Sequence, residues 1–433
     1  MLTRKVMLII ALVCVPALAA GSLAQAGDPT PFPRLDGGEI SESGSPTGSR
    51  FLVSPLDTPE AHEWYSSVAY NSQWQEYLVV WHASTATNKY IYGQFLTATG
   101  ALIGSRFMIS PPVGRNLYPD VAYNPDRNEY LVVYMVETAT ADVYGIYGMR
   151  LDAYGAPLGG ERCFATSPPD NNYWHPAVAY EAFNDRYLVT WQRIQGTFKG
   201  IEARTLPGDG STMESSIAVT GLLATLEPSN PDVACNLSVD TCLVVWQEWY
   251  DATLSDHEVR GQRVDLETSP HLEGTTFSIF YSTNDEGSPA VSSVVRPSGI
   301  GEYLVVAVSA YASSAFIYGQ LLTDAGALDG SSFIISPYGG TIPAIAGNEL
   351  TKEFLVAWKY GSNIQARTVN TSGSLGLYAQ AVPNGSYTDW PAVAAGQLSD
   401  FLVTFHDQVP GYNFDIFGQL WGNRLFLPAI SKN

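Results

Sequence analysis

Aromatic and histidine side chains recur at one kind of place in this sequence, in the loops that lead into short segments reading Pro-x-Val-Ala or a close variant. They are Trp64, Tyr65, Tyr118, Tyr173, Trp174, His175 and Trp390. Planar rings beside amides and carboxylates suit sugars, because the rings stack on C–H faces while the polar groups bind hydroxyls. Such rings also wedge between packed elements of a fold, so a ligand surface and a packing role both stay open.

Two further histidines, His82 and His406, directly follow segments of the YLVVW type. Histidines on separate elements rarely make a metal site, so we expect no metal here. Solvated loop side chains are the favoured interpretation, and a polar cluster with Asp407 and Asp415 that takes part in ligand binding is the alternative.

The sequence contains no G-x-S-x-G, HExxH or Cys–His arrangement. It therefore identifies no catalytic residue and predicts no cofactor. A pair of acids for cleaving polysaccharide stays open, because 42 Asp and Glu residues supply many chance pairs.

The aromatic positions belong to a repeat with seven copies that lie 48 to 58 residues apart. A copy opens with the Pro-x-Val-Ala segment, continues through YLVVW and YGQ or their variants, and ends with F-x-I-S. Short segments rich in Val, Tyr and Trp between Gly, Pro, Asn and Asp are typical of strands. Both alternating sets of residues in 77–81 are apolar, so the sheet must be covered on both faces. The opening segments are centred on Val68, Val121, Val178, Val233, Val291, Ile345 and Val393.

The two ends of the repeat region complement each other. Residues 48–55 closely copy residues 104–111, the fourth strand of the first unit, yet they precede any complete unit, and the last unit has no matching fourth strand after Gln419. A closed ring requires an extra strand at the N-terminal end that can complete the last unit, which lacks its fourth strand. An open array of repeats would instead need polar capping repeats at both ends. The sequence therefore predicts an all-β fold, a seven-bladed β-propeller of four-stranded antiparallel blades closed by residues 51–54.

The repeat resembles that of secreted bacterial seven-bladed β-propeller proteins with YLVVW and YGQ repeats, over about residues 48–420. The resemblance implies the fold and says little about function. The recurrent Gly-His and Trp-Asp pairs of WD40 repeats are absent, so the function of that family is not implied.

Cys235 and Cys242 fall on the first and second strands of one hairpin when the copies are aligned. Cross-strand neighbours approach within about 5 Å, so we predict a disulfide. Cys163 aligns with a fourth strand and is expected to remain a thiol.

The first residues follow the pattern of a cleaved signal peptide, with Arg4 and Lys5 before an apolar run and Ala24-Gln25-Ala26 at its end. We therefore expect a signal peptide over 1–26, a flexible leader over 27–47, the β-propeller domain over 48–424 and a C-terminal tail over 425–433. This pattern predicts a secreted or cell-envelope protein, and no later segment is long and apolar enough to span a membrane. The net charge of −20 makes nucleic acid a poor partner.

The favoured function is a binding or scaffold module outside the cytoplasm, a monomer that holds a glycan or another protein on its aromatic-lined loop face. One alternative is a hydrolase or lyase that acts on polysaccharide on the propeller scaffold. The other is a structural envelope protein without a small ligand.

Overall fold

The computed structural model describes residues 45–422, with gaps at 55–61, 85–87, 113, 167–169, 251–255, 268, 312, 381–386, 398–399 and 409–412. All these residues belong to one compact unit, Asp36–Asn433. The predicted signal peptide, most of the predicted leader and the predicted C-terminal tail lie outside the described residues. Within the described part of the chain, no helix could cross a membrane.

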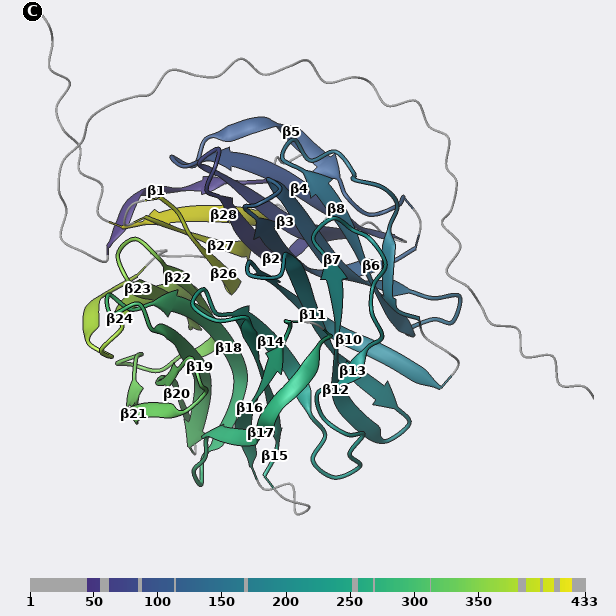
Figure 1. The fold of residues 1–433 in the computed structure, drawn as a ribbon. Coiled ribbons are helices and arrows are strands. Elements are labelled where there is room, and N and C mark those ends of the chain that lie inside the picture. Colours follow the sequence, from purple (N-terminus) through teal and green to yellow (C-terminus); the bar gives the residue numbers. More distant parts are fainter. Residues whose placement is uncertain are drawn as a thin grey trace, which may run out of the picture. The chain divides into compact units, whose positions relative to one another are not determined.

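The described residues form seven four-stranded antiparallel sheets, the blades of a β-propeller, which confirms the predicted fold (Figure 1). Blade 1 is β2 (His62–Asn71), β3 (Glu76–Ser84), β4 (Lys89–Thr97) and β5 (Leu102–Met108). Blade 2 is β6 (Asn116–Asn124), β7 (Glu129–Glu137), β8 (Tyr144–Asp152) and β9 (Arg162–Ala165). Blade 3 is β10 (Asn171–Glu181), β11 (Arg186–Gln195), β12 (Phe198–Pro207) and β13 (Ile217–Ala218). Blade 4 is β14 (Ser229–Cys235), β15 (Thr241–Trp249), β16 (His257–Asp265) and β17 (His271–Phe280). Blade 5 is β18 (Asp285–Val295), β19 (Gly301–Tyr311), β20 (Ser314–Thr323) and β21 (Leu328–Ile334). Blade 6 is β22 (Thr341–Asn348), β23 (Glu353–Tyr360), β24 (Asn363–Asn370) and β25 (Leu375–Gln380). Blade 7 is β26 (Asp389–Ala395), β27 (Phe401–Gln408), β28 (Phe414–Trp421) and β1 (Pro46–Leu52).

The N-terminal strand closes the ring, as the sequence predicts. β1 pairs antiparallel with β28, with Phe51 opposite Gly418. The pairing continues beyond the strand, where the Val53 amide donates to the Ile416 carbonyl at 2.8 Å. It begins at Pro46, inside the range assigned above to the leader. The first strands of all seven blades also contact their neighbours around the ring, including β2 with β26.

The second strands explain why both faces of YLVVW are apolar. Tyr77, Val79 and Trp81 pack with Val53 of blade 7, whereas Leu78 and Val80 pack with blade 2. All five strand residues from 77 to 81 are fully buried. Each second strand therefore stabilises two interfaces between blades, which a strand with one solvent-exposed face could not do.

The glycine of the YGQ segment makes room for the aromatic side chain of the fourth strand. A Cβ at Gly418 would lie 2.6 Å from the Phe51 ring, and one at Gly93 would lie 2.9 Å from the Phe107 ring. The neighbouring glutamine also holds the fourth strand, because Gln419 Nε2 donates to the carbonyl of Thr47 at 3.1 Å. The repeated YGQ and F-x-I-S motifs are thus two halves of one contact.

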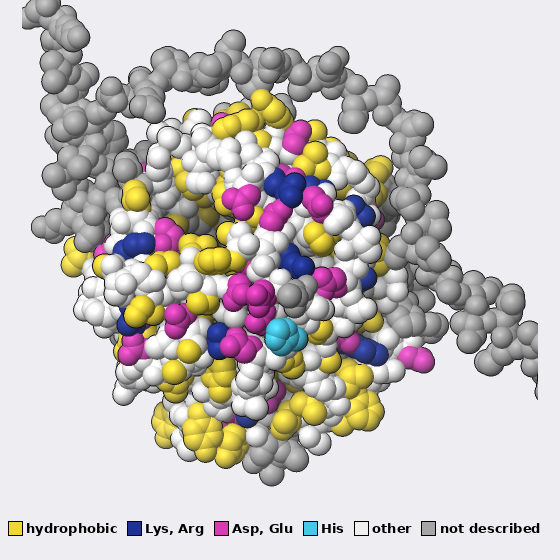
Figure 2. All heavy atoms as spheres, viewed as in Figure 1, with side chains coloured by type: hydrophobic (Ala, Val, Ile, Leu, Met, Phe, Trp, Pro, Cys, Tyr) yellow, Lys and Arg dark blue, Asp and Glu magenta, His cyan; other side chains and the backbone are white. Residues whose placement is uncertain are grey.

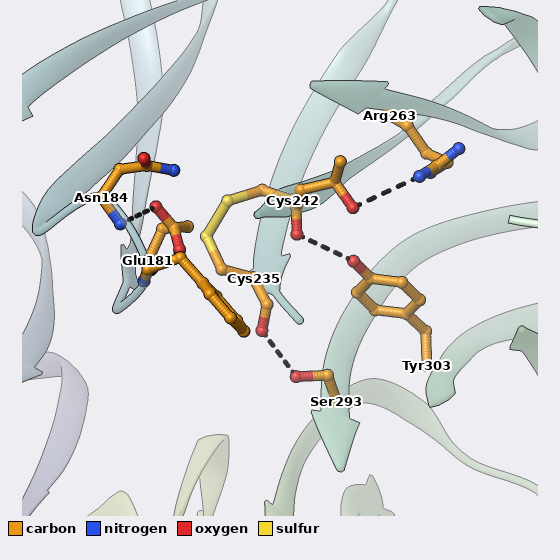
Figure 3. Close-up of a disulfide and its surroundings, with 9 residues drawn as sticks. Glu181, Asn184, Cys235, Cys242, Arg263, Ser293 and Tyr303 are labelled. Carbon is orange, nitrogen blue, oxygen red and sulfur yellow. Dashed lines mark hydrogen bonds between the residues drawn. A yellow bond between two sulfur atoms is a disulfide. The ribbon is translucent and has the colours of Figure 1, made fainter. Parts of the chain in front are cut away.

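The predicted disulfide joins Cys235 and Cys242, which pair across β14 and β15. Figure 3 shows hydrogen bonds from blade 5 to the backbone on both sides of it. Ser293 Oγ donates to the Cys235 carbonyl at 2.7 Å, and the Tyr303 hydroxyl donates to the Thr241 carbonyl at 3.1 Å. The cysteine side chains themselves pack in the core between blades 3 and 4, together with Ala177 and Leu188. The bridge therefore faces blade 3, while the backbone on either side of it is bonded to blade 5.

Candidate functional site

A β-bulge recurs at the same place in all seven first strands. In blade 1, Trp64 and Ser67 of β2 pair with β3, and the two residues between them have no partner in β3. The first strand of every other blade has two unpaired residues at the equivalent place. The first unpaired residue always has a left-handed backbone, with φ between 49° and 54°. We call these seven residues the bulge ring: Tyr65, Tyr118, His175, Asn230, Ser288, Ile342 and Trp390.

No member of the bulge ring is glycine, although this conformation costs other residues on the order of 1–3 kcal/mol each. Because all seven blades share it, the conformation belongs to the architecture of the ring. Only the side chains differ from blade to blade, so they determine what each position of the bulge ring can bind.

Four members of the bulge ring line a central cavity of about 710 Å³ that the first strands enclose. They are Trp390, Tyr65, Tyr118 and His175, and they come from four successive blades, 7, 1, 2 and 3. The ring centroids of Trp390 and Tyr65 lie 4.6 Å apart, those of Tyr65 and Tyr118 4.4 Å, and those of Tyr118 and His175 5.3 Å. These side chains form an unbroken series, which we call the aromatic arc.

A second layer of rings packs behind the aromatic arc. His82 stacks on Tyr65 at 5.4 Å, and Trp64 lies 5.6 Å from His406. Both histidines are only 2% exposed, so their interpretation as solvated loop side chains is wrong. The reason is that the strands continue past the YLVVW segment: His82 pairs with Trp64 and His406 pairs with Asp389.

The remaining two predicted residues lie in blade 3. Trp174 is half-buried and packs 5.9 Å from His175 and 5.7 Å from Tyr144. Tyr173 is buried in the hydrophobic core between blades 2 and 3, where it packs against Trp191. Of the nine predicted ligand residues, four therefore line the cavity, four stand behind these, and Tyr173 belongs to the core. Only Trp390 is exposed among the tryptophans of this group, at 38%.

Several buried nitrogen atoms around the arc have no hydrogen-bond partner among the described residues. They are the indole nitrogens of Trp64 and Trp174 and the Nδ1 atoms of His82, His175 and His406. A buried polar group without a partner costs about 1–3 kcal/mol, so these atoms require a partner such as ordered water or a ligand.

The three histidines of the site are uncharged at neutral pH. Burial, together with the charges of Lys89 and His406, lowers the pKa of His82 to about 3. Burial likewise lowers the pKa of His175 and of His406 to about 4. A neutral imidazole donates with one nitrogen and accepts with the other, which matches the two-sided hydrogen bonding of a hydroxyl group.

Two acidic side chains that were not predicted from the sequence, Asp120 and Asp232, also line the cavity. Asp120 accepts hydrogen bonds from Ser67 Oγ at 2.7 Å and from the Val178 amide at 2.8 Å. Asp232 accepts from the Val291 amide at 2.8 Å. Each acid therefore joins its own blade to the next one.

Burial, with a smaller contribution from the charge of Asp120, raises the pKa of Asp232 to about 7. The sequence did carry a signal for both acids, because they follow Pro119 and Pro231 at a position where the other copies have Ser or Ala.

The rim beside the aromatic arc is polar. Lys359 of blade 6 forms an ion pair with Asp389 of blade 7, next to His406. Phe414, the first residue of β28, packs 5.1 Å from Trp64.

A separate group of acids lies in blade 4, where oxygen atoms of Asp240, Asp265 and Glu267 approach within 4.8 Å of one another. Acidic side chains also gather near the centre of the face that Figure 2 displays, coloured magenta. Exposed acids commonly lie together without a bound ion, and no other observation on the described residues points to a cation here.

No family model matches the chain, and a search of curated proteins found no match. Among solved structures, the chain is similar to a protein of unknown function from Dyadobacter fermentans DSM 18053, at 11% identity and a TM-score of 0.54 over 87% of this chain and 98% of that one. It is also similar to the polysaccharide lyase Uly1, at 8% identity and a TM-score of 0.52 over 89% of this chain and 99% of that one. These likenesses show the fold alone.

Proposed function

We propose that this protein binds a neutral glycan at the mouth of its central channel, with the sugar rings against the aromatic arc. The observation that carries the proposal is the series of four rings on successive blades that lines one cavity. Aromatic rings in such a series stack on the apolar faces of sugar rings. The neutral imidazoles and indole N–H groups next to these aromatic rings can form hydrogen bonds with sugar hydroxyls.

The charges of the cavity favour a neutral ligand over an anionic one. Among the described residues that line it, none is Lys or Arg, whereas Asp120 and Asp232 are acids. A sulfated or uronic acid polymer would therefore meet two acidic groups and no compensating cation, which costs binding energy.

The proposed location is outside the cytoplasm. The disulfide between Cys235 and Cys242 supports it, because such bridges persist in oxidising compartments. The sequence pattern of residues 1–26 supports it as well.

A glycan array followed by calorimetric titration tests the proposal. Trp390→Ala and Tyr118→Ala are expected to weaken binding of the best neutral glycan by about ten- to a hundredfold, as loss of an aromatic anchor does. Ile342→Ala is the matched control, because Ile342 has the same backbone position in blade 6 and is not among the residues that line the cavity. Trp390→Ala should leave the melting temperature nearly unchanged, since this side chain is 38% exposed.

The proposal is wrong if Ile342→Ala weakens binding as much as Trp390→Ala does. A blank array with both neutral and acidic glycans would instead favour a structural envelope protein. Binding of a protein partner that Trp390→Ala abolishes would keep the site and replace the ligand.

Cleavage of the bound polysaccharide is the second candidate function. The observation that favours it is the carboxyl group of Asp232, which has a pKa of about 7 in a cavity that also contains Asp120. Glycoside hydrolysis uses two carboxyl groups, of which one has a raised pKa and donates a proton; burial raises the pKa of Asp120 as well. Product analysis on any glycan that binds separates the two functions. If the glycan is cleaved, and Asp232→Asn abolishes cleavage but not binding, the protein is an enzyme. If no product forms, the binding function stands.

A further inference from the structure

A second cavity, of about 620 Å³, lies between blades 4 and 5 and shares no lining residue with the central cavity. Its walls come from the end of β17 and from β18, β19, β20 and β21. Four of the lining residues carry the argument: Glu286, Ser309, Tyr318 and Ser332.

Glu286 is a buried carboxylate in this cavity, with only 2% of the residue exposed. Its Oε1 atom accepts hydrogen bonds from Ser282 Oγ and, at 3.3 Å, from Ser309 Oγ. Its Oε2 atom has no hydrogen-bond partner among the described residues. Burial raises the pKa of Glu286, and hydrogen bonds from Ser282 and Ser309 offset this only in part. Neutral hydrogen-bond donors do not fully compensate a buried negative charge, and no cation among the described residues pairs with this carboxylate.

Blade 1 shows how the same framework supplies that cation. Glu63 has the position of Glu286, because it precedes the bulge of β2 and pairs with Ala83 as Glu286 pairs with Ser309. Arg106 Nη1 donates to Glu63 Oε1 at 2.9 Å. The guanidinium carbon of Arg106 also lies 4.8 Å from the centre of the Tyr92 ring. The arginine of β5 thus fills the space between a carboxylate and an aromatic ring.

Blade 5 keeps the carboxylate and the ring but lacks the arginine. Gly93 pairs with Phe107 in blade 1 and Gly319 pairs with Phe333 in blade 5, which places Tyr318 at the position of Tyr92. The same alignment places Ser332 at the position of Arg106. The cavity of blade 5 therefore lies where blade 1 has a guanidinium group.

From this vacancy between Glu286 and Tyr318 we infer a binding site for a guanidinium group, brought either by a small organic molecule or by an arginine side chain of a polypeptide. Charge-assisted hydrogen bonds to the carboxylate and a cation–π contact with the tyrosine would hold it. The hydroxyls of Ser278, Ser331 and Ser332 and the amide of Asn284 line the same space and suit the remaining polar atoms of such a ligand. This site is independent of the glycan site proposed above.

Calorimetric titration of the full chain with N-ethylguanidinium and with the peptide acetyl-Gly-Arg-Gly-amide tests the inference, with N-ethylurea as the neutral compound of the same shape. We expect saturable binding of the guanidinium compounds at one site and none of N-ethylurea. Glu286→Gln should weaken this binding by about tenfold or more, because the remaining amide oxygen accepts a hydrogen bond without the negative charge of the carboxylate.

Ser332→Arg should abolish binding, because it supplies the internal arginine that blade 1 has. Ser372→Arg adds the same charge on an exposed turn of blade 6 and should leave binding unchanged. A much tighter complex with the peptide than with N-ethylguanidinium assigns a polypeptide ligand, and equal affinities assign a small molecule.

The absence of saturable binding by both guanidinium compounds overturns the inference. Binding that Glu286→Gln does not weaken overturns it as well, and this variant decides the question even if Ser332→Arg fails to fold.

Discussion

Removal of the closing strand gives the most direct test of the ring. We compare the protein that begins at residue 45 with the protein that begins at residue 55, which lacks β1 and the two residues after it. The shorter protein leaves β28 as an unpaired sheet edge in blade 7.

The structure sets the size of the expected effect. Val53 is fully buried, and burial of such a side chain contributes about 1.5–3 kcal/mol. The half-buried Phe51 and Leu52 together add about as much again. Hydrogen bonds such as that from the Ile416 amide to Ser54 Oγ contribute about 1 kcal/mol each. We therefore expect a loss of about 5 kcal/mol, or roughly 5–10 °C in melting temperature for a chain of this length.

Differential scanning calorimetry measures this difference, and a synthetic peptide of residues 45–54 provides the control. Added in excess, the peptide should pair with β28 and restore much of the lost stability to the shorter protein. Equal melting temperatures of the two proteins without the peptide would refute the reasoning, since a strand that carries no stability cannot close the ring.

Three further predictions concern single sites. Replacement of both Cys235 and Cys242 by Ser should lower the free energy of unfolding by about 2.5 kcal/mol in a urea titration, because the bridge closes a short loop over a sequence separation of 7; a change near zero would contradict this. Burial raises the pKa of Asp232 in the folded state from its ordinary value of 3.8 to about 7, so this group stabilises the fold below pH 4 and that stability is lost as the pH rises through 7. Relative to Asp232→Asn, the wild type should therefore become less stable between pH 4 and 7, and parallel pH profiles would exclude the effect. Ile342 is a β-branched residue with φ of 52°, so Ile342→Asn should relieve about 1 kcal/mol of strain, and a clear loss of stability in urea would contradict this.

The repeat made the fold predictable, because blade number, strand order and closure all follow from spacing. The burial of Tyr77 to Trp81 on both faces follows from the same pattern, and so does the pairing of Cys235 with Cys242. Each of these features depends on contacts that every copy repeats, so seven copies give the same information several times.

The candidate site was less predictable, because it depends on where copies differ. The length of the second strand decides whether His82 is exposed, and the letters YLVVW do not show where the strand ends. Tyr173 and His175 are two residues apart, yet one lies in the core and the other lines the cavity. The bulge that separates their environments is a backbone feature, and the non-glycine residues that form it give no sign of left-handed φ.

The pairing of β1 with β28 also has a consequence for the order of events during synthesis. β1 leaves the ribosome first, but its partner is made last, and Gln419 donates to a carbonyl 372 residues earlier in the chain. The entropy of closing so long a loop grows only with the logarithm of its length, so the distance adds little to the equilibrium cost. It adds waiting time, during which six blades can form while β1 has no partner. The polar Ser49 and the charged Arg50 in the middle of β1 make this strand a poor template for pairing with other chains while it waits.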